Sequence, residues 1–202
     1  MNILLTAFDP FGGDDTNSSM MTLEKVSDCI DNVKIHKMIV PTVYKESAEA
    51  VAQKANQINA DCVLCMGQAG GRRNISVEVI AINYALADLC DNKNNRYLGE
   101  KLVENGENAL FATVPVKKMV DAVKKKGFEA SLSASAGAFV CNSLLYLLLS
   151  KLSVPVGFVH LPYAKEQGKD AFSMDAEDMA LCIEEMIKTI KNSERICNIC
   201  AE

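Results

Sequence analysis

The stretch CNSLLYLLLSKLSVPVGFVH, residues 141–160, places a helix directly before a buried strand. Its first part, Asn142 to Leu152, is almost continuously apolar and long enough for a helix. Its second part, Val154 to His160, is a short apolar run that Pro155 introduces, which is typical of a strand covered on both faces. A helix that leads into such a strand is the repeating unit of a parallel α/β sheet.

The same alternation extends over most of the chain. We expect further strands over 2–8, 33–40, 61–66, 76–82 and 131–135, and further helices from residue 17 or 18 to 29 and over 47–58, 116–126 and 174–192. The polar segment 88–106 is expected to be a loop. This order predicts a three-layer α/β/α sandwich with a central, largely parallel mixed sheet. Functional loops gather at the carboxyl ends of parallel strands, so we expect those after Phe8, Met66, Ser135 and His160 to share one edge.

Composition excludes several classes of function. The 202 residues suit a single domain, and the net charge of −5 comes with no basic run longer than Lys124 to Lys126, so a nucleic-acid partner is not expected. The longest apolar runs, such as Leu144 to Leu149, are too short to span a membrane. The opening MNILLTAFDPFGG has no basic n-region and no cleavage site, so a cytoplasmic protein is expected.

The eight cysteines are expected to be reduced thiols, and no metal site is expected. Two CxxC pairs exist, Cys62/Cys65 and Cys197/Cys200, and paired motifs of this kind can bind zinc. However, Cys62 and Cys65 lie in an apolar run that is typical of a strand. Residues three apart on a strand point to opposite faces, so these two thiols cannot ligate one metal there.

Cys141 and His160 are the candidate nucleophile and base. Cys141 opens a helix, where the positive end of the dipole favours a thiolate and where first-turn N–H groups can face an oxyanion. His160 ends a buried strand, the position at which α/β enzymes hold catalytic groups. The other histidine, His36, is flanked by lysines and is expected on a wet face of a strand.

Glu78 is the candidate for the group that orients the imidazole. It is surrounded by apolar residues in ISVEVIAIN, residues 75–83. An unpaired buried charge is costly, so a carboxylate in such a strand needs a partner. Together with Cys141 and His160 it would complete a nucleophile–base–acid triad.

Five motifs together resemble those of the pyroglutamyl peptidase type I family, also called pyrrolidone-carboxylate peptidases. They are LLTAFDPFGG (4–13), GQAGGR (67–72), VEVIAIN (77–83), GAFVCNSLLY (137–146) and GFVHLPY (157–163). The resemblance extends from Leu4 to about Ile187. It implies a single peptidase domain over 1–202, without a cofactor, that removes an N-terminal pyroglutamyl residue from peptides, in the cytoplasm and often as a homotetramer.

The resemblance also implies roles for particular residues. The catalytic triad falls on Cys141, His160 and Glu78. The pyroglutamyl pocket falls on Phe8, Phe11, Asn17 and Gln68. This pocket is physically reasonable, because the pyroglutamyl ring is a flat, neutral lactam that two aromatic rings can sandwich. An ordinary N-terminal ammonium buried there without a partner would cost several kcal/mol, which corresponds to roughly a hundredfold discrimination or more.

The sequence departs from the family pattern after the VEVIAIN motif. Relatives commonly carry an arginine and then I-P-D-N, whereas this chain has Asp88 at the arginine position and Cys90 at the proline position. The change from positive to negative charge is expected to weaken the stabilisation of a nearby thiolate or oxyanion.

Two other functions fit part of the sequence. The glycine-rich GQAGGRR loop, with Arg72 or Arg73, is compatible with phosphate binding in a nucleoside phosphorylase of similar fold. A non-catalytic module that binds pyroglutamyl peptides is compatible with the pocket residues and with the change at Asp88.

Overall fold

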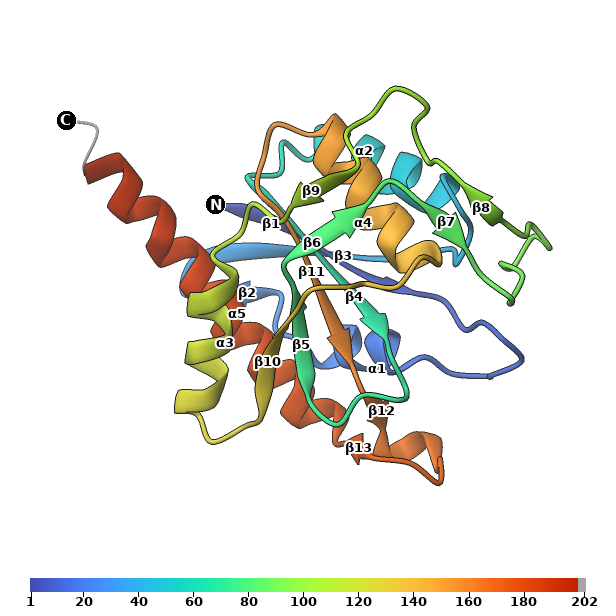
Figure 1. Cartoon of the computed structure of the whole chain (residues 1–202). Helices are drawn as coiled ribbons and strands as arrows, with labels where there is room; N and C mark the ends of the chain where they lie inside the picture. Colours follow the sequence, from blue (N-terminus) through green and yellow to red (C-terminus); the bar gives the residue numbers. More distant parts are fainter. Residues whose placement is uncertain (200–202) are drawn as a thin grey trace.

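A seven-stranded sheet forms the centre of the computed structural model, which describes residues 1–199 and the side chains of residues 1–193 (Figure 1). The strand order is β10-β5-β11-β4-β1-β3-β2. The bounds are β1 Asn2–Phe8, β2 Cys29–Ile30, β3 Val33–Val40, β4 Cys62–Gln68, β5 Ile75–Glu78, β10 Ala130–Ser133 and β11 Val156–Leu161. Strands β11, β4, β1 and β3 are mutually parallel, whereas β5 is antiparallel to β11 and β2 is antiparallel to β3. The predicted mixed, largely parallel sheet is therefore confirmed.

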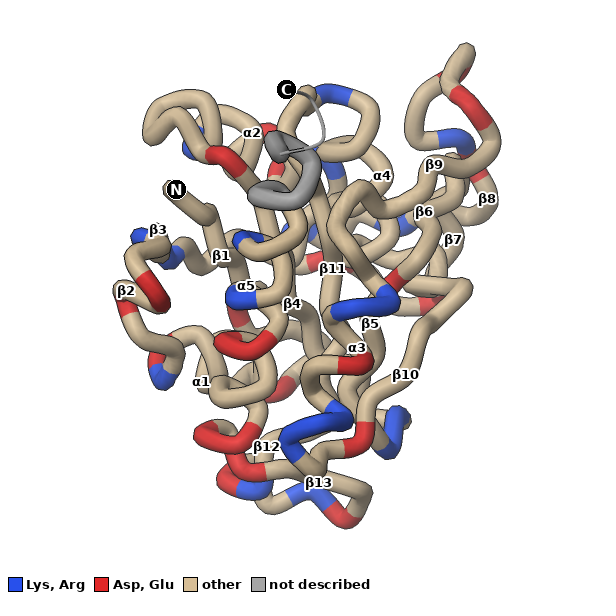
Figure 2. The backbone as a smooth tube through the Cα atoms, turned by 90° about the vertical axis from the view of Figure 1, so that its left-hand side faces the viewer, with Lys and Arg blue, Asp and Glu red and all other residues tan. Residues whose placement is uncertain are grey.

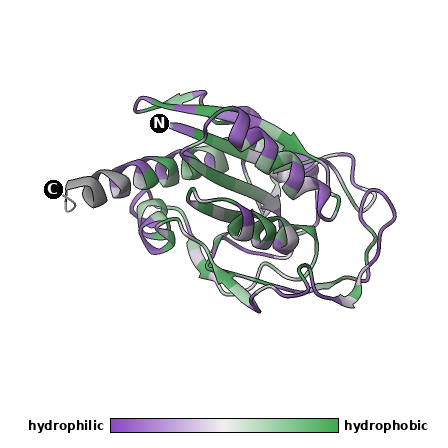
Figure 3. Cartoon of the chain, turned by 90° about the horizontal axis from the view of Figure 1, so that it is seen from above, coloured by the Kyte–Doolittle hydropathy of each residue, from purple (hydrophilic) through white to green (hydrophobic). Residues whose placement is uncertain are grey.

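Helices cover both faces of the sheet and complete the predicted sandwich (Figures 1 and 3). Their bounds are α1 Ser18–Lys25, α2 Glu46–Gln57, α3 Val116–Lys125, α4 Val140–Lys151 and α5 Ala176–Ile199. One apolar cluster joins the sheet to α1, α3 and α5, and a second joins its other face to α2 and α4. Cys62 belongs to the first cluster and Cys65 to the second, as their spacing on β4 predicts. The side chains of Cys197 and Cys200 lie outside the described residues.

Local sequence signals set several helix ends. The Asn17 side chain caps α1 by accepting a hydrogen bond of 3.0 Å from the Ser19 N–H. Gly127 follows α3 with a φ of 88°, a conformation that favours glycine after a helix. The expected extension of α1 to residue 29 is wrong, because Cys29 and Ile30 pair with β3 as strand β2.

The strand expected over 76–82 divides at Val79. β5 stays in the main sheet, while β6 (Ile80–Ile82) turns away to pair with β9 (Ala109–Phe111). The segment 88–106, expected as a loop, contains strand β8 (Leu98–Glu100), which pairs with β7 (Ala85–Leu86). Because the strand divides here, Glu78 is the last residue of β5 in the main sheet.

The expected common edge is only partly correct. The carboxyl ends of β1, β4 and β11 do share one edge. β10, however, is parallel to β5 and therefore runs opposite to β11, so the loop after Ser135 starts away from that edge. This loop instead leads to α4 across the face of the sheet, and it thereby brings Cys141 over the ends of β4 and β11.

Charge is distributed without a single dominant sign in the view of Figure 2, where Lys and Arg segments are interspersed with Asp and Glu segments. Within residues 1–199, no helix combines the length and the apolar character needed to cross a bilayer.

Candidate active site

The predicted catalytic side chains share one face of the sheet because of strand register. His160 lies beside Gly67 on β4 and beside Ser76 on β5. Side chains of paired residues point to the same face, and alternate residues repeat that face. Glu78, two residues after Ser76, therefore projects on the face of His160. This face is the one that α4, the helix of Cys141, covers.

Glu78 and His160 form a buried hydrogen bond, with 2.7 Å between His160 Nδ1 and Glu78 Oε1. Their exposed fractions are 0% and 4%. Burial by itself would raise the pKa of Glu78, but the hydrogen bond and charge of His160, together with the Arg72 guanidinium, hold that pKa below its ordinary value. An ionised carboxylate only accepts, so His160 donates from Nδ1–H, and Nε2 is left with the lone pair of a base.

The Cys141 thiol lies against the backbone of Gly67, the strand neighbour of His160. A Cβ atom built at residue 67 would lie only 3.1 Å from Cys141 Sγ. Cys141 is the second residue of α4 and is partly exposed. The surrounding protein raises the pKa of the thiol to about 12, mainly by burial and then by the charge of Glu78, while Arg72 opposes that rise. The backbone at the start of α4 does lower the pKa, as expected for a helix N-terminus, but burial has the larger effect.

A base, an orienting carboxylate and a thiol at a helix N-terminus are the parts of a thiol-dependent acyl-transfer site. The model of the pyroglutamyl peptidase family matches residues 1–198. The chain belongs to the pyroglutamyl peptidase family. It is 42% identical over 198 residues to pyrrolidone-carboxylate peptidase 1 of Caldanaerobacter subterraneus subsp. tengcongensis, covering 94% of this chain and 98% of that protein.

Solved structures agree with this membership. Pyroglutamyl peptidase I from Bacillus amyloliquefaciens is 34% identical, with a TM-score of 0.89 over 94% of each chain. Pyrrolidone carboxyl peptidase from Pyrococcus furiosus is 28% identical, with a TM-score of 0.89 over 96% of this chain and 99% of that one. The predicted family is confirmed, and the protein is a cysteine peptidase of the pyroglutamyl peptidase family.

Arg72 is a site residue whose role the sequence did not reveal. Its Nη1 lies 2.7 Å from Glu78 Oε1, and its Nη2 donates to the Ser135 carbonyl at 2.9 Å. The only sequence signal was its place in the GQAGGR motif, which also allowed a phosphate loop. Because its guanidinium is already paired with a buried carboxylate, Arg72 is poorly suited to phosphate binding in this family member.

Gln68 is held with its amide oxygen inward. Gln68 Oε1 accepts from the Ser18 N–H at 2.8 Å and from Gln167 Nε2 at 2.9 Å. Backbone groups fix both amides, because Gln167 Nε2 also donates to the Thr16 carbonyl and Gln167 Oε1 accepts from the Ala164 N–H. Gln68 Nε2 makes no hydrogen bond to a described residue and is not among the buried unpaired atoms, so it is the end of Gln68 that solvent reaches.

The other predicted pocket residues have different surroundings. Asn17 is fully buried, and besides capping α1 its Nδ2 donates to the Asp9 carbonyl at 3.0 Å. Phe8 is 2% exposed and packs on Phe158, whose ring centroid is 4.8 Å from that of His160. Asn17 and Phe8 are therefore buried side chains that support the neighbouring residues of the site.

Phe11 packs beside the start of α4. Its ring is 6.1 Å from that of Phe139, the N-cap residue of α4 two positions before Cys141. The Phe139 ring also meets Tyr44 edge-on at 5.4 Å, and the Tyr44 hydroxyl donates to the Ala138 carbonyl. Aromatic side chains therefore surround the helix end that carries the nucleophile.

Two residues considered from the sequence lie away from the triad. Asp88 is fully exposed and pairs with Arg96 at 3.3 Å, and the charged side chains that act on Cys141 are Glu78 and Arg72. His36 is partly buried, with Nε2 3.3 Å from Asn2 Oδ1 near the amino end of β1. Asp88 is therefore not one of the charges that act on Cys141, and Arg72 is the cation that does.

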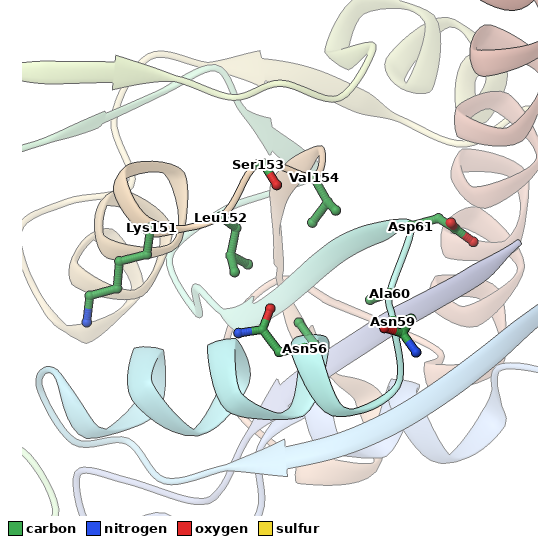
Figure 4. A pocket seen from close by; sticks show the side chains of 9 residues that line it. Asn56, Asn59, Ala60, Asp61, Lys151, Leu152, Ser153 and Val154 are labelled. Carbon is green, nitrogen blue, oxygen red and sulfur yellow. The ribbon is translucent and has the colours of Figure 1, made fainter.

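A surface hollow of about 540 Å³ lies elsewhere, between the end of α2 and the turn after α4 (Figure 4). Asn56, Asn59, Lys151 and Val154 contribute to its lining. It borders the residues that precede β4 and β11, so it opens at the edge of the sheet opposite to His160. The catalytic candidates take no part in it.

Proposed function

We propose that the protein removes the N-terminal pyroglutamyl residue from peptides, with Cys141 as nucleophile, His160 as base and acid, and Glu78 as the orienting group. The observation that carries the proposal is the buried 2.7 Å hydrogen bond from His160 to Glu78, on the face where the Cys141 thiol also lies. A base whose tautomer is fixed by a carboxylate, next to a nucleophile, is the arrangement that acyl transfer requires.

The first half of the reaction forms a thioester. Cys141 Sγ attacks the pyroglutamyl carbonyl carbon while His160 Nε2 takes the thiol proton, and the carbonyl oxygen becomes an oxyanion. The carbon–nitrogen bond then breaks as the imidazolium gives that proton to the departing amine. The shortened peptide leaves, and the pyroglutamyl group remains on sulfur.

The second half restores the enzyme. His160 takes a proton from water, the hydroxide oxygen adds to the thioester carbon, and the carbon–sulfur bond breaks. The thiolate regains its proton from the imidazolium, and free pyroglutamate leaves.

Backbone amides are proposed to stabilise the oxyanion. The first hydrogen bond of α4 runs from the Ser143 N–H to the Phe139 carbonyl at 3.1 Å. The N–H groups of Cys141 and Asn142 precede it and are not used within the helix. They lie beside the nucleophile, where a developing negative charge would also meet the positive end of the helix dipole.

The pocket is proposed to recognise the lactam by shape and by neutrality. The accessible Nε2 of Gln68 offers a donor for the ring carbonyl, and Phe11 offers an apolar wall beside the start of α4, while Phe8 and Asn17 hold these parts in place. A peptide that begins with glutamine would instead bring an ammonium group. Its burial without a partner is costly, so selectivity arises from desolvation.

Hydrolysis of coumarin amides tests this function. The wild-type protein should release coumarin from the pyroglutamyl amide at least about a hundredfold faster than from the glutaminyl amide. The Cys141→Ala variant should keep the wild-type circular-dichroism spectrum and release none. Near-normal turnover by Cys141→Ala would contradict the mechanism, and tight binding by wild type without release would contradict the peptidase.

We also propose that residues 1–202 form one domain and that the protein is a cytoplasmic homotetramer, as the family resemblance implies. Tetramer formation is supported by the exposed apolar side chains of Leu98 and Phe111 on the small sheets and of Tyr84 between β6 and β7, at 67%, 67% and 40% exposure. Size-exclusion chromatography with light scattering should give four times the chain mass, and a stable monomer would contradict the assembly. Cell fractionation tests the location, and a single cooperative unfolding transition tests the domain.

A further inference from the structure

The two cationic or titratable partners of the Glu78 carboxylate meet on one oxygen. His160 Nδ1 and Arg72 Nη1 each lie 2.7 Å from Glu78 Oε1. Within the described part of the chain, Oε2 of the same carboxylate is buried and has no hydrogen-bond partner. The guanidinium and the imidazole therefore share a single acceptor atom.

The arginine is held at this position by two further contacts. Its Nη2 donates to the Ser135 carbonyl at 2.9 Å, in the loop that leads to Cys141, and its own N–H donates to the Ala69 carbonyl at 3.0 Å. The Arg72 side chain is 26% exposed, so most of it is enclosed. A planar guanidinium that bridges two acceptors keeps its orientation better than a lysine would.

We propose that Arg72 is a positioning residue that keeps His160 in its neutral, proton-accepting form at neutral pH. The inference rests on the proposed function, because it concerns the base of that reaction. An imidazole beside a lone buried carboxylate would favour a standing imidazolium–carboxylate pair. An imidazole that already carries the proton cannot take one from the Cys141 thiol. The guanidinium balances the charge of Glu78, so the carboxylate orients the imidazole without protonating it.

The electrostatics of the site agree with this role. Burial lowers the pKa of His160, Glu78 opposes that lowering, and Arg72 reinforces it. The titratable and charged groups around the imidazole are Glu78 from β5, Arg72 from the preceding loop and Cys141 from α4. Cys65 on β4 and the Tyr44 hydroxyl face the Cys141 thiol in turn.

The pH dependence of kcat/KM tests the proposal with three variants. In Arg72→Gln the imidazole should hold its proton more strongly, so the ratio of kcat/KM at about pH 8 to that at about pH 6 should grow by roughly tenfold. Arg72→Lys keeps the charge and should keep the wild-type pH profile at a lower kcat. Arg73→Gln is the matched control, because it removes an exposed arginine from the same loop and should leave both profile and rate unchanged.

Two outcomes of these assays would overturn the role of Arg72. One is a uniform loss of rate in Arg72→Gln with the wild-type pH profile, which is what a purely structural residue would give. The other is a profile in Arg72→Lys that matches Arg72→Gln. In both cases wild-type turnover of the pyroglutamyl amide would leave the proposed function standing.

A measurement on the wild-type protein does not depend on how the variants fold. The chain has two histidines, so ¹⁵N-histidine NMR, assigned with His36→Gln, resolves His160. The proposal predicts a neutral His160 imidazole at about pH 7 with the proton on Nδ1. A doubly protonated imidazolium at that pH would overturn it, whether or not the protein proves to be a peptidase.

Discussion

Replacement of Gly67 by alanine should disable the enzyme while leaving it folded. The added Cβ would lie 3.1 Å from Cys141 Sγ and 2.9 Å and 3.2 Å from two carbons of the Phe158 ring. Ordinary contacts between such atoms are about 3.5–4.0 Å, so something must move by roughly 0.5–1 Å. Both neighbours must therefore shift: the partly exposed Cys141 thiol, and the buried Phe158 ring, which packs on the His160 ring. A displacement of about 1 Å in a reacting group can cost about a hundredfold in rate.

We therefore expect Gly67→Ala to lower kcat/KM for a pyroglutamyl coumarin amide by about a hundredfold. Overpacking should lower the free energy of unfolding by only about 1–3 kcal/mol, measured by urea titration. The matched control is Gly71→Ala in the same loop, where an added Cβ meets nothing within 4 Å, and its activity should stay within about twofold of wild type. Wild-type kcat/KM in Gly67→Ala would refute the placement of the thiol against residue 67.

Three further predictions concern the surroundings of the site. Gln167→Leu removes a donor that orients Gln68, so KM for the pyroglutamyl amide should rise by up to about tenfold with little change in kcat, and a loss confined to kcat would contradict this role. Asn17→Ala removes the α1 cap and should lower the free energy of unfolding by about 1 kcal/mol in urea titration, whereas an unchanged midpoint would argue against the cap. The folded protein lowers the pKa of His160 from 6.5 and that of Glu78 from 4.5, so as the pH falls the unfolded state takes up each proton before the folded state does. The free energy of unfolding should therefore fall below about pH 6.5 because of His160 and below about pH 4.5 because of Glu78. The slope of the free energy of unfolding against pH should approach about 1.4 kcal/mol per pH unit for one proton. His160→Gln should flatten the high-pH part of this curve, and a wild-type curve that is flat there would contradict the buried neutral imidazole.

The pairing of Glu78 with His160 was predictable because both residues break a local pattern. Glu78 interrupts an apolar strand and His160 ends one, and a polar group in such a position needs a partner or a function. Their hydrogen bond follows from strand alternation once β5 and β11 are adjacent. The direction of the Cys141 pKa shift was not predictable, because it depends on how deeply the protein encloses the thiol.

Long-range geometry explains what the sequence could not reveal. An apolar strand pattern reads alike in both directions, so nothing marked β5 and β10 as antiparallel to β11. The pairing of β6 with β9 joins segments almost thirty residues apart and has no local signal. Arg72 reaches Glu78 only because the chain turns back between β4 and β5, and Gln167 reaches Gln68 across 99 residues.

The central claim, that Cys141 carries the reaction, is tested most directly by timed alkylation with iodoacetamide. Samples would be assayed on the pyroglutamyl amide and mapped by mass spectrometry, which separates Cys141 from the exposed Cys29 and Cys90. Activity should fall in proportion to the modified fraction of Cys141, and free pyroglutamate should slow both changes together. Full activity in protein whose Cys141 is completely alkylated would contradict the account.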